Sequence, residues 1–183
     1  MCATAKQIMG WTLGLPQKAQ NGSSNKLMRG ALSKGGVEGW VQVELEEIYN
    51  SLPNTSWVQR EQNIYINPLD KVDFLICCSD ASYTCVELKV ESLYQSSDAG
   101  RVTMPHTGWR VVEEDVEQLA QKRKPDYQAA RAFVVAIVWS QEATDGMDNW
   151  LALRLLDFER EQMLVEHDGS AFRVTVYVIT VTS

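Results

Sequence analysis

The segment CVELKVES, residues 85–92, carries a charged side chain at every second position. Glu87, Lys89 and Glu91 alternate with apolar residues. Because strand side chains alternate between the two faces, this pattern predicts a strand with one polar and one apolar face. The polar face is either a solvated surface or half of a metal site, which needs a further carboxylate nearby. We expect Glu91 to be an ordinary acid outside that site.

A second carboxylate precedes this strand. Asp73 lies near the start of VDFLICC, an apolar run of strand length, and the polar segment 79–83 between the two runs suits a hairpin loop. If paired residue numbers sum to about 160, Asp73 lies opposite Glu87. Two such acids repel unless a hard cation neutralises them, and Mg²⁺ binds carboxylate pairs of this kind. Lys89, on the same face, could then orient a water for attack on a phosphodiester.

The surrounding elements predict a mixed sheet with helices on its faces, of the α/β (α+β) class. Apolar residues at steps of four and three predict a helix that ends at Pro53, with Glu44 at the rim of its packed face. Residues 1–34 are expected to be an irregular arm, with one short helix at most, and residues 35–183 a single domain. The other expected elements are strands at 57–66, 72–78, 84–92 and 133–139, a helix at 109–124, a segment ambiguous between helix and strand at 149–162, and a terminal hairpin that turns at Asp168 and Gly169.

The ordered set of Glu44 in a helix, Asp73 at the start of a strand and Glu87-x-Lys89 on the next strand resembles the PD-(D/E)xK nuclease superfamily. The resemblance covers roughly residues 35–140 of the chain. Val72 stands where the family name has proline. The resemblance implies a restriction-endonuclease-like fold, with an αβββαβ core followed here by a C-terminal β-hairpin extension.

The resemblance also implies roles for individual residues. Asp73 and Glu87 would bind Mg²⁺ or Mn²⁺ together with the backbone carbonyl of Leu88, and Lys89 would position the nucleophilic water. Glu44 would complete the acidic cluster, although Glu47 or Glu38 could be the acid that does so. The candidate accessory residues are Gln118, Asp115 and Gln95.

The densest basic run, Lys122-Arg123-Lys124, is a candidate for phosphate contacts, although basic residues are also usual at a helix C-terminus. The formal net charge of −7 gives no overall attraction to nucleic acid. The resemblance therefore implies a metal-dependent nuclease, with DNA expected ahead of RNA. The alternative is a protein of the same fold that acts in binding or assembly, or on a small substrate. A homodimer would suit cleavage of both strands of a duplex.

The composition is that of an ordinary globular chain of 183 residues with 45% hydrophobic residues. The four cysteines show no zinc spacing, and Cys77, Cys78 and Cys85 lie in apolar runs where a thiol behaves as a small apolar side chain. The N-terminal segment is too polar for a signal-peptide core and no segment is expected to span a membrane, so we expect an intracellular protein.

Overall fold

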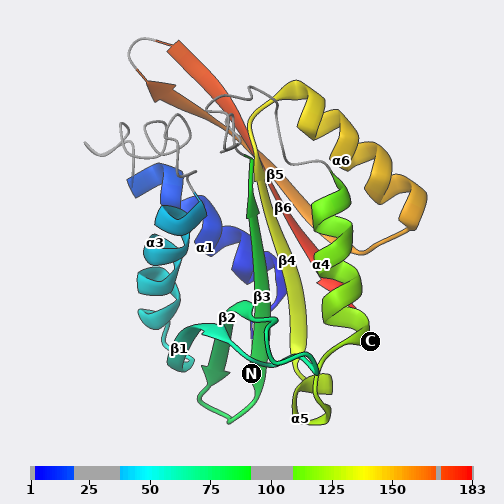
Figure 1. The fold of residues 1–183 in the computed structure, drawn as a ribbon. Helices are drawn as coiled ribbons and strands as arrows, with labels where there is room; N and C mark the ends of the chain where they lie inside the picture. The colour runs from blue at the N-terminus through cyan, green and yellow to red at the C-terminus, as the bar shows by residue number, and fades with distance from the viewer. Residues whose placement is uncertain (1–2, 19–37, 92–108, 168–169, 183) are drawn as a thin grey trace, which may run out of the picture.

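The computed structural model describes residues 3–18, 38–91, 109–167 and 170–182, which form a mixed α+β fold around one sheet (Figure 1). The six-stranded sheet has the order β1-β2-β3-β4-β6-β5. The strands are β1 (Thr55–Gln62), β2 (Val72–Cys78), β3 (Tyr83–Val90), β4 (Arg131–Val138), β5 (Phe158–His167) and β6 (Ser170–Val181). The helices are α1 (Ala5–Lys18), α3 (Glu38–Asn50), α4 (Trp109–Gln121), α5 (Pro125–Gln128) and α6 (Gln141–Arg154).

The sheet is covered by helices on both faces (Figure 1). Helices α1 and α3 pack on one face and α4 and α6 on the other, each pair over its own cluster of buried apolar side chains. Strands β3 and β4 are parallel, joined through α4, whereas every other neighbouring pair is antiparallel. Both central strands are buried, and β4 has the nearly continuous apolar sequence that is typical of such a strand.

The predicted hairpin register is confirmed. Phe74 pairs with Val86 and Ile76 with Thr84, so the paired numbers sum to 160. A shift of one residue would have sent the charged side chains to the opposite face. The register therefore places Asp73 and Glu87 at the next position beyond the last paired residues, where β2 and β3 separate.

Two expectations about the elements need correction, and one open alternative is decided. The arm is not irregular throughout, because α1 is a helix of 14 residues whose Ile8, Met9 and Leu15 are buried against the sheet. The ambiguous segment 149–162 contains both elements: α6 ends at Arg154, Leu155 caps it in a left-handed conformation, and β5 follows. The first strand ends earlier than expected, at Gln62.

The terminal hairpin is confirmed, because His167 pairs with Ser170; its turn at positions 168 and 169 lies outside the described residues. Cys77 and Cys85 are buried free thiols, as expected of small apolar side chains. Cys78 is disulfide-bonded, so that expectation is wrong for Cys78. No helix in the described part of the chain has the length and apolar character needed to cross a membrane.

Candidate active site at the separation of β2 and β3

Asp73 lies where the backbone pairing between β2 and β3 ends. Beyond this point, its carboxylate accepts a hydrogen bond from the backbone of β3. The N–H of Leu88 donates to Asp73 Oδ2 at 2.7 Å. The N–H of Asp73 in turn lies 3.3 Å from Glu87 Oε2, which accepts from it. The two predicted metal-binding carboxylates are therefore neighbours, as the register required.

Helix α3 holds the other oxygen of Asp73. Gln42 Nε2 donates to Asp73 Oδ1 at 2.7 Å. Glu38 lies one turn earlier on the same face of the helix, and its Oε2 accepts the N–H of Val90 at 3.3 Å. Both α3 side chains thus reach across to the two strands that carry the charged residues.

Glu87 is 5% exposed, and its environment disfavours the ionised form. Burial, with the nearby charges of Asp73 and Asp115, raises the pKa of Glu87 to about 9, although a hydrogen bond from Tyr65 opposes the shift. That bond runs from the Tyr65 hydroxyl to Glu87 Oε1, and the Tyr65 side chain is fully buried. Without a cation, Glu87 is therefore a protonated acid at neutral pH.

Lys89 forms an ion pair with α4. Its Nζ lies 3.2 Å from Asp115 Oδ2, and both side chains are largely shielded from water. Burial alone would lower the pKa of Lys89, but the charges of Asp115, Glu38 and Asp73 raise it well above its usual range. Burial raises the pKa of Asp115 to about 6, despite the opposing charge of Lys89. Lys89 is therefore an ammonium at neutral pH, and it can donate protons in hydrogen bonds but cannot act as a base.

The helix acid at this cluster is Glu38, one of the alternatives to Glu44. Burial raises the pKa of Glu38. The positive charge of Lys89 lowers this pKa, and the negative charge of Asp73 raises it. Glu44 is six residues further along α3, so its side chain points about 120° away from that of Glu38 around the helix axis. The structure thus brings Glu38 to Lys89 and places the predicted Glu44 on a different side of α3.

Among the accessory candidates, Asp115 is at the cluster, as expected. Gln118 lies one turn further along α4 and is half-buried, with its backbone carbonyl accepting the N–H of Lys122. Gln95 lies outside the described residues. The sequence did not indicate Gln42 or Tyr65. Gln42 could have been found by its spacing of four from Glu38, whereas no local pattern marks Tyr65.

The basic run has a different role from the one predicted. Arg123 is 2% exposed, so the prediction of a phosphate contact is wrong for this residue. Its guanidinium donates to the carbonyl of Leu119 in the last turn of α4 and to those of Tyr127 and Ala130 in and after α5. The Lys124 ammonium donates to the carbonyl of Asn63 at 2.9 Å. Of the three, Lys122 alone has an exposed side chain that remains a candidate for phosphate.

Glu91 is fully buried, so the expectation of an ordinary acid is wrong. Its Oε2 accepts the N–H groups of Trp139 and Ser140 at 2.7 and 2.8 Å, where β4 leads into α6. Glu91 thereby ties the end of β3 to the start of α6, and this contact leaves it outside the Asp73–Glu87 cluster.

The donor set suits a hard cation, although no three His, Cys, Asp or Glu side chains in the described ranges already form a group that could hold a metal ion. Asp73 and Glu87 supply two adjacent carboxylates, the kind of ligand that Mg²⁺ prefers. A strand residue directs its N–H and C=O to the same side, so the carbonyl of Leu88 faces the side of Asp73. The buried, protonated Glu87 is the group whose ionisation a cation would favour.

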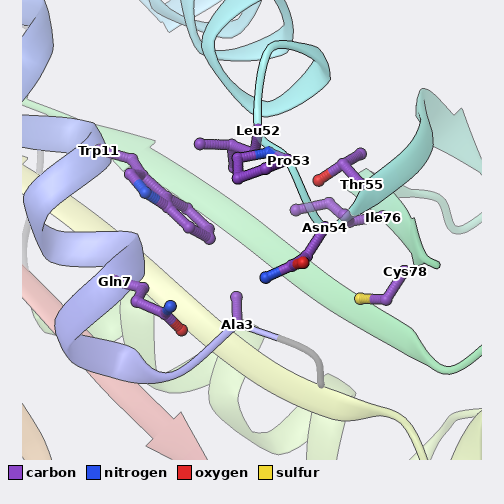
Figure 2. A pocket seen from close by; sticks show the side chains of 9 residues that line it. All are labelled: Ala3, Gln7, Trp11, Leu52, Pro53, Asn54, Thr55, Ile76 and Cys78. Atoms are coloured by element: carbon purple, nitrogen blue, oxygen red, sulfur yellow. The ribbon is translucent and has the colours of Figure 1, made fainter. Parts of the chain in front are cut away.

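Two cavities in the described part of the molecule lie away from this cluster. One of about 140 Å³ lies between α1 and the turn after α3, with Trp11, Pro53 and Ile76 in its wall (Figure 2). The other, of about 230 Å³, lies between α4 and α6, next to Trp150 and Leu156. Neither includes Asp73, Glu87 or Lys89 in its wall, so neither of these two cavities is part of the candidate site.

The chain was compared with protein families, with characterised proteins and with solved structures, and no match was found in any of the three.

Proposed function

We propose that this protein is a metal-dependent phosphodiester hydrolase of the restriction-endonuclease-like, PD-(D/E)xK type, acting on nucleic acid and on DNA ahead of RNA. The observation that carries the proposal is the adjacency of Asp73 and Glu87 where β2 and β3 separate, with Lys89 two residues along the same strand face. The order of α3, three strands, α4 and β4 around this point also supports it.

In the proposed site, Asp73, Glu87 and the carbonyl of Leu88 would hold Mg²⁺ or Mn²⁺. When bound, the cation would act as a Lewis acid that stabilises negative charge developing on the phosphodiester oxygens. Gln42 and the N–H of Leu88 fix the orientation of the Asp73 carboxylate. Because these hydrogen bonds already orient the Asp73 carboxylate, cation binding would require little rearrangement of it.

Lys89 would orient the attacking water and stabilise the charge that develops on it. It does so as an ammonium, because the surrounding acids keep it protonated. Asp115 forms an ion pair with this ammonium from α4, and the negative charge of Glu38 on α3 also favours its protonated form, so we assign Glu38 the place that was predicted for Glu44. The proton of the water must therefore pass to solvent or to the substrate, since Lys89 has no capacity to take it.

A second candidate is a protein of the same fold that cuts no nucleic acid and acts in binding, assembly or on a small substrate. One observation favours it: Glu87 and Lys89 already have protein partners, Tyr65 and Asp115, that satisfy them without a cation. The net charge of −7 points the same way. Such a protein would bind neither divalent cations at this cluster nor nucleic acid.

Cleavage of duplex and single-stranded DNA and of RNA, with Mg²⁺ or Mn²⁺ added, tests the proposal. We expect cleavage that needs the cation and is abolished in Asp73→Asn and in Lys89→Ala. Glu114→Gln is the matched control, because Glu114 is an exposed acid of α4. Unchanged cleavage in both site variants would overturn the assignment. Absence of cleavage together with absence of cation binding would favour the second candidate.

A further inference from the structure

Tyr65 is a neighbour of the candidate site that comes from neither the hairpin nor the helices beside it. It lies in the connection between β1 and β2, is fully buried, and donates its hydroxyl hydrogen bond to Glu87 Oε1. The other oxygen, Oε2, lies toward Asp73. The hydroxyl thus determines which oxygen of Glu87 faces its partner carboxylate.

The backbone around Tyr65 is fixed to the end of α4. The N–H of Ile66 donates to the carbonyl of Lys122, and the N–H of Lys124 donates to the carbonyl of Ile64, both at 2.8 Å. These two bonds flank Tyr65 on either side. We call the segments 63–66 and 122–124 the Tyr65 clamp.

Arg123 secures the clamp from inside. It pairs with Tyr65 in an isolated β-bridge, and its buried guanidinium donates to three carbonyls at the end of α4 and beyond. Lys124 adds a bond from its ammonium to Asn63 at the other edge. A tyrosine held this firmly has little freedom to follow Glu87, so Glu87 takes the position that the tyrosine sets.

We propose that Tyr65 is a positioning residue for the cation-binding carboxylate: its hydroxyl occupies one oxygen of Glu87 and presents the other to the cation beside Asp73. This inference rests on the proposed function, since it assumes that Asp73 and Glu87 bind a cation. Partners of this kind commonly contribute about tenfold to a hundredfold to metal affinity, because they orient the ligand. Tyr65 would orient Glu87 without itself being a ligand of the metal.

Calorimetric titration with Mn²⁺ alone, in the absence of nucleic acid, tests the inference. Tyr65→Phe removes only the hydroxyl, and we expect it to weaken Mn²⁺ binding by about tenfold to a hundredfold. The matched control is Tyr177→Phe. Tyr177 is also fully buried and donates its hydroxyl to a carboxylate, Asp148, at 2.8 Å, but on β6. We expect this control to bind Mn²⁺ as the wild type does.

The outcomes separate the two proposals. Wild-type affinity in Tyr65→Phe would overturn the positioning role and leave the proposed function standing, provided that Glu87→Gln abolishes binding. Absence of Mn²⁺ binding by the wild-type chain would overturn both. If Tyr65→Phe does not fold, Lys124→Met replaces it, because it loosens the clamp while keeping the tyrosine. A several-fold weaker affinity in Lys124→Met would support the inference, and an unchanged affinity would overturn it.

Discussion

The ammonium of Lys89 lies 3.2 Å from Asp115 Oδ2, so a lysine of β3 and an aspartate of α4 form an ion pair beneath the helix layer. Removing either partner leaves the other as a poorly hydrated charge, which is more costly than removing both. This ion pair explains why Lys89 stays protonated.

Lys89→Met and Asp115→Asn should each lower the free energy of unfolding, and the double variant should lose less than the sum of the two. We expect a coupling of about 1 kcal/mol, within the usual range for residues in contact. Urea unfolding of the four proteins in the cycle measures it. Strictly additive losses would show that the two side chains do not interact.

The contribution of Glu87 to the stability of the cation-free protein should fall as pH rises from about 4.5 to about 9. Folding raises the pKa of Glu87 from 4.5 to about 9, mainly through burial. Its contribution to stability is therefore complete below the unfolded value and is lost as pH rises through the folded one. Glu87→Gln, which stays neutral, should be more stable than the wild type at pH 8–9 by more than about 1 kcal/mol. Parallel stability curves for the two proteins between pH 5 and pH 9 would contradict this assignment.

Glu38 and Glu44 should differ sharply when each is changed to glutamine. Because Glu38 contacts β3 and acts on Lys89, Glu38→Gln should lower cleavage by about tenfold or more. Glu44 points to another side of α3, so Glu44→Gln should cleave at a rate close to that of the wild type. Initial rates at saturating Mg²⁺ make the comparison. A larger loss in Glu44→Gln would restore the prediction made from the sequence.

Glu91→Ala should lower the free energy of unfolding, because Glu91 lies outside the Asp73–Glu87 cluster and its contacts are structural. Two backbone N–H groups, those of Trp139 and Ser140, lose their acceptor, at a cost of about 1–3 kcal/mol. Glu114→Ala on exposed surface should change the free energy of unfolding by less than about 0.5 kcal/mol. Denaturant unfolding compares the two. Equal stability of both variants would argue that the Glu91 contacts contribute nothing.

The hairpin and its charged face could be predicted from the sequence because they depend on local rules. Strand alternation and the length of the loop fixed the pairing of Phe74 with Val86, and with it the approach of Asp73 to Glu87. The ammonium of Lys89 on the same face followed from the same alternation. These relationships involve residues within one hairpin.

The remaining parts of the site depend on packing between distant segments. Tyr65 reaches Glu87 only because the connection after β1 is bonded to the end of α4, which no local pattern reveals. Arg123 looked like a surface cation because its sequence neighbours are basic, whereas its side chain is buried under carbonyls. The choice between Glu38 and Glu44 depended on the rotation of α3 about its axis relative to the sheet. The apolar stripe of a helix determines this rotation only approximately.

Anomalous diffraction from crystals soaked in Mn²⁺ would show whether Asp73 and Glu87 bind a cation, because it locates the metal without depending on any substrate. We expect one peak between Asp73 and Glu87, bonded to oxygens of both carboxylates and close to the carbonyl of Leu88. A well-diffracting soaked crystal with no peak there, or with Mn²⁺ bound only elsewhere, would contradict this expectation.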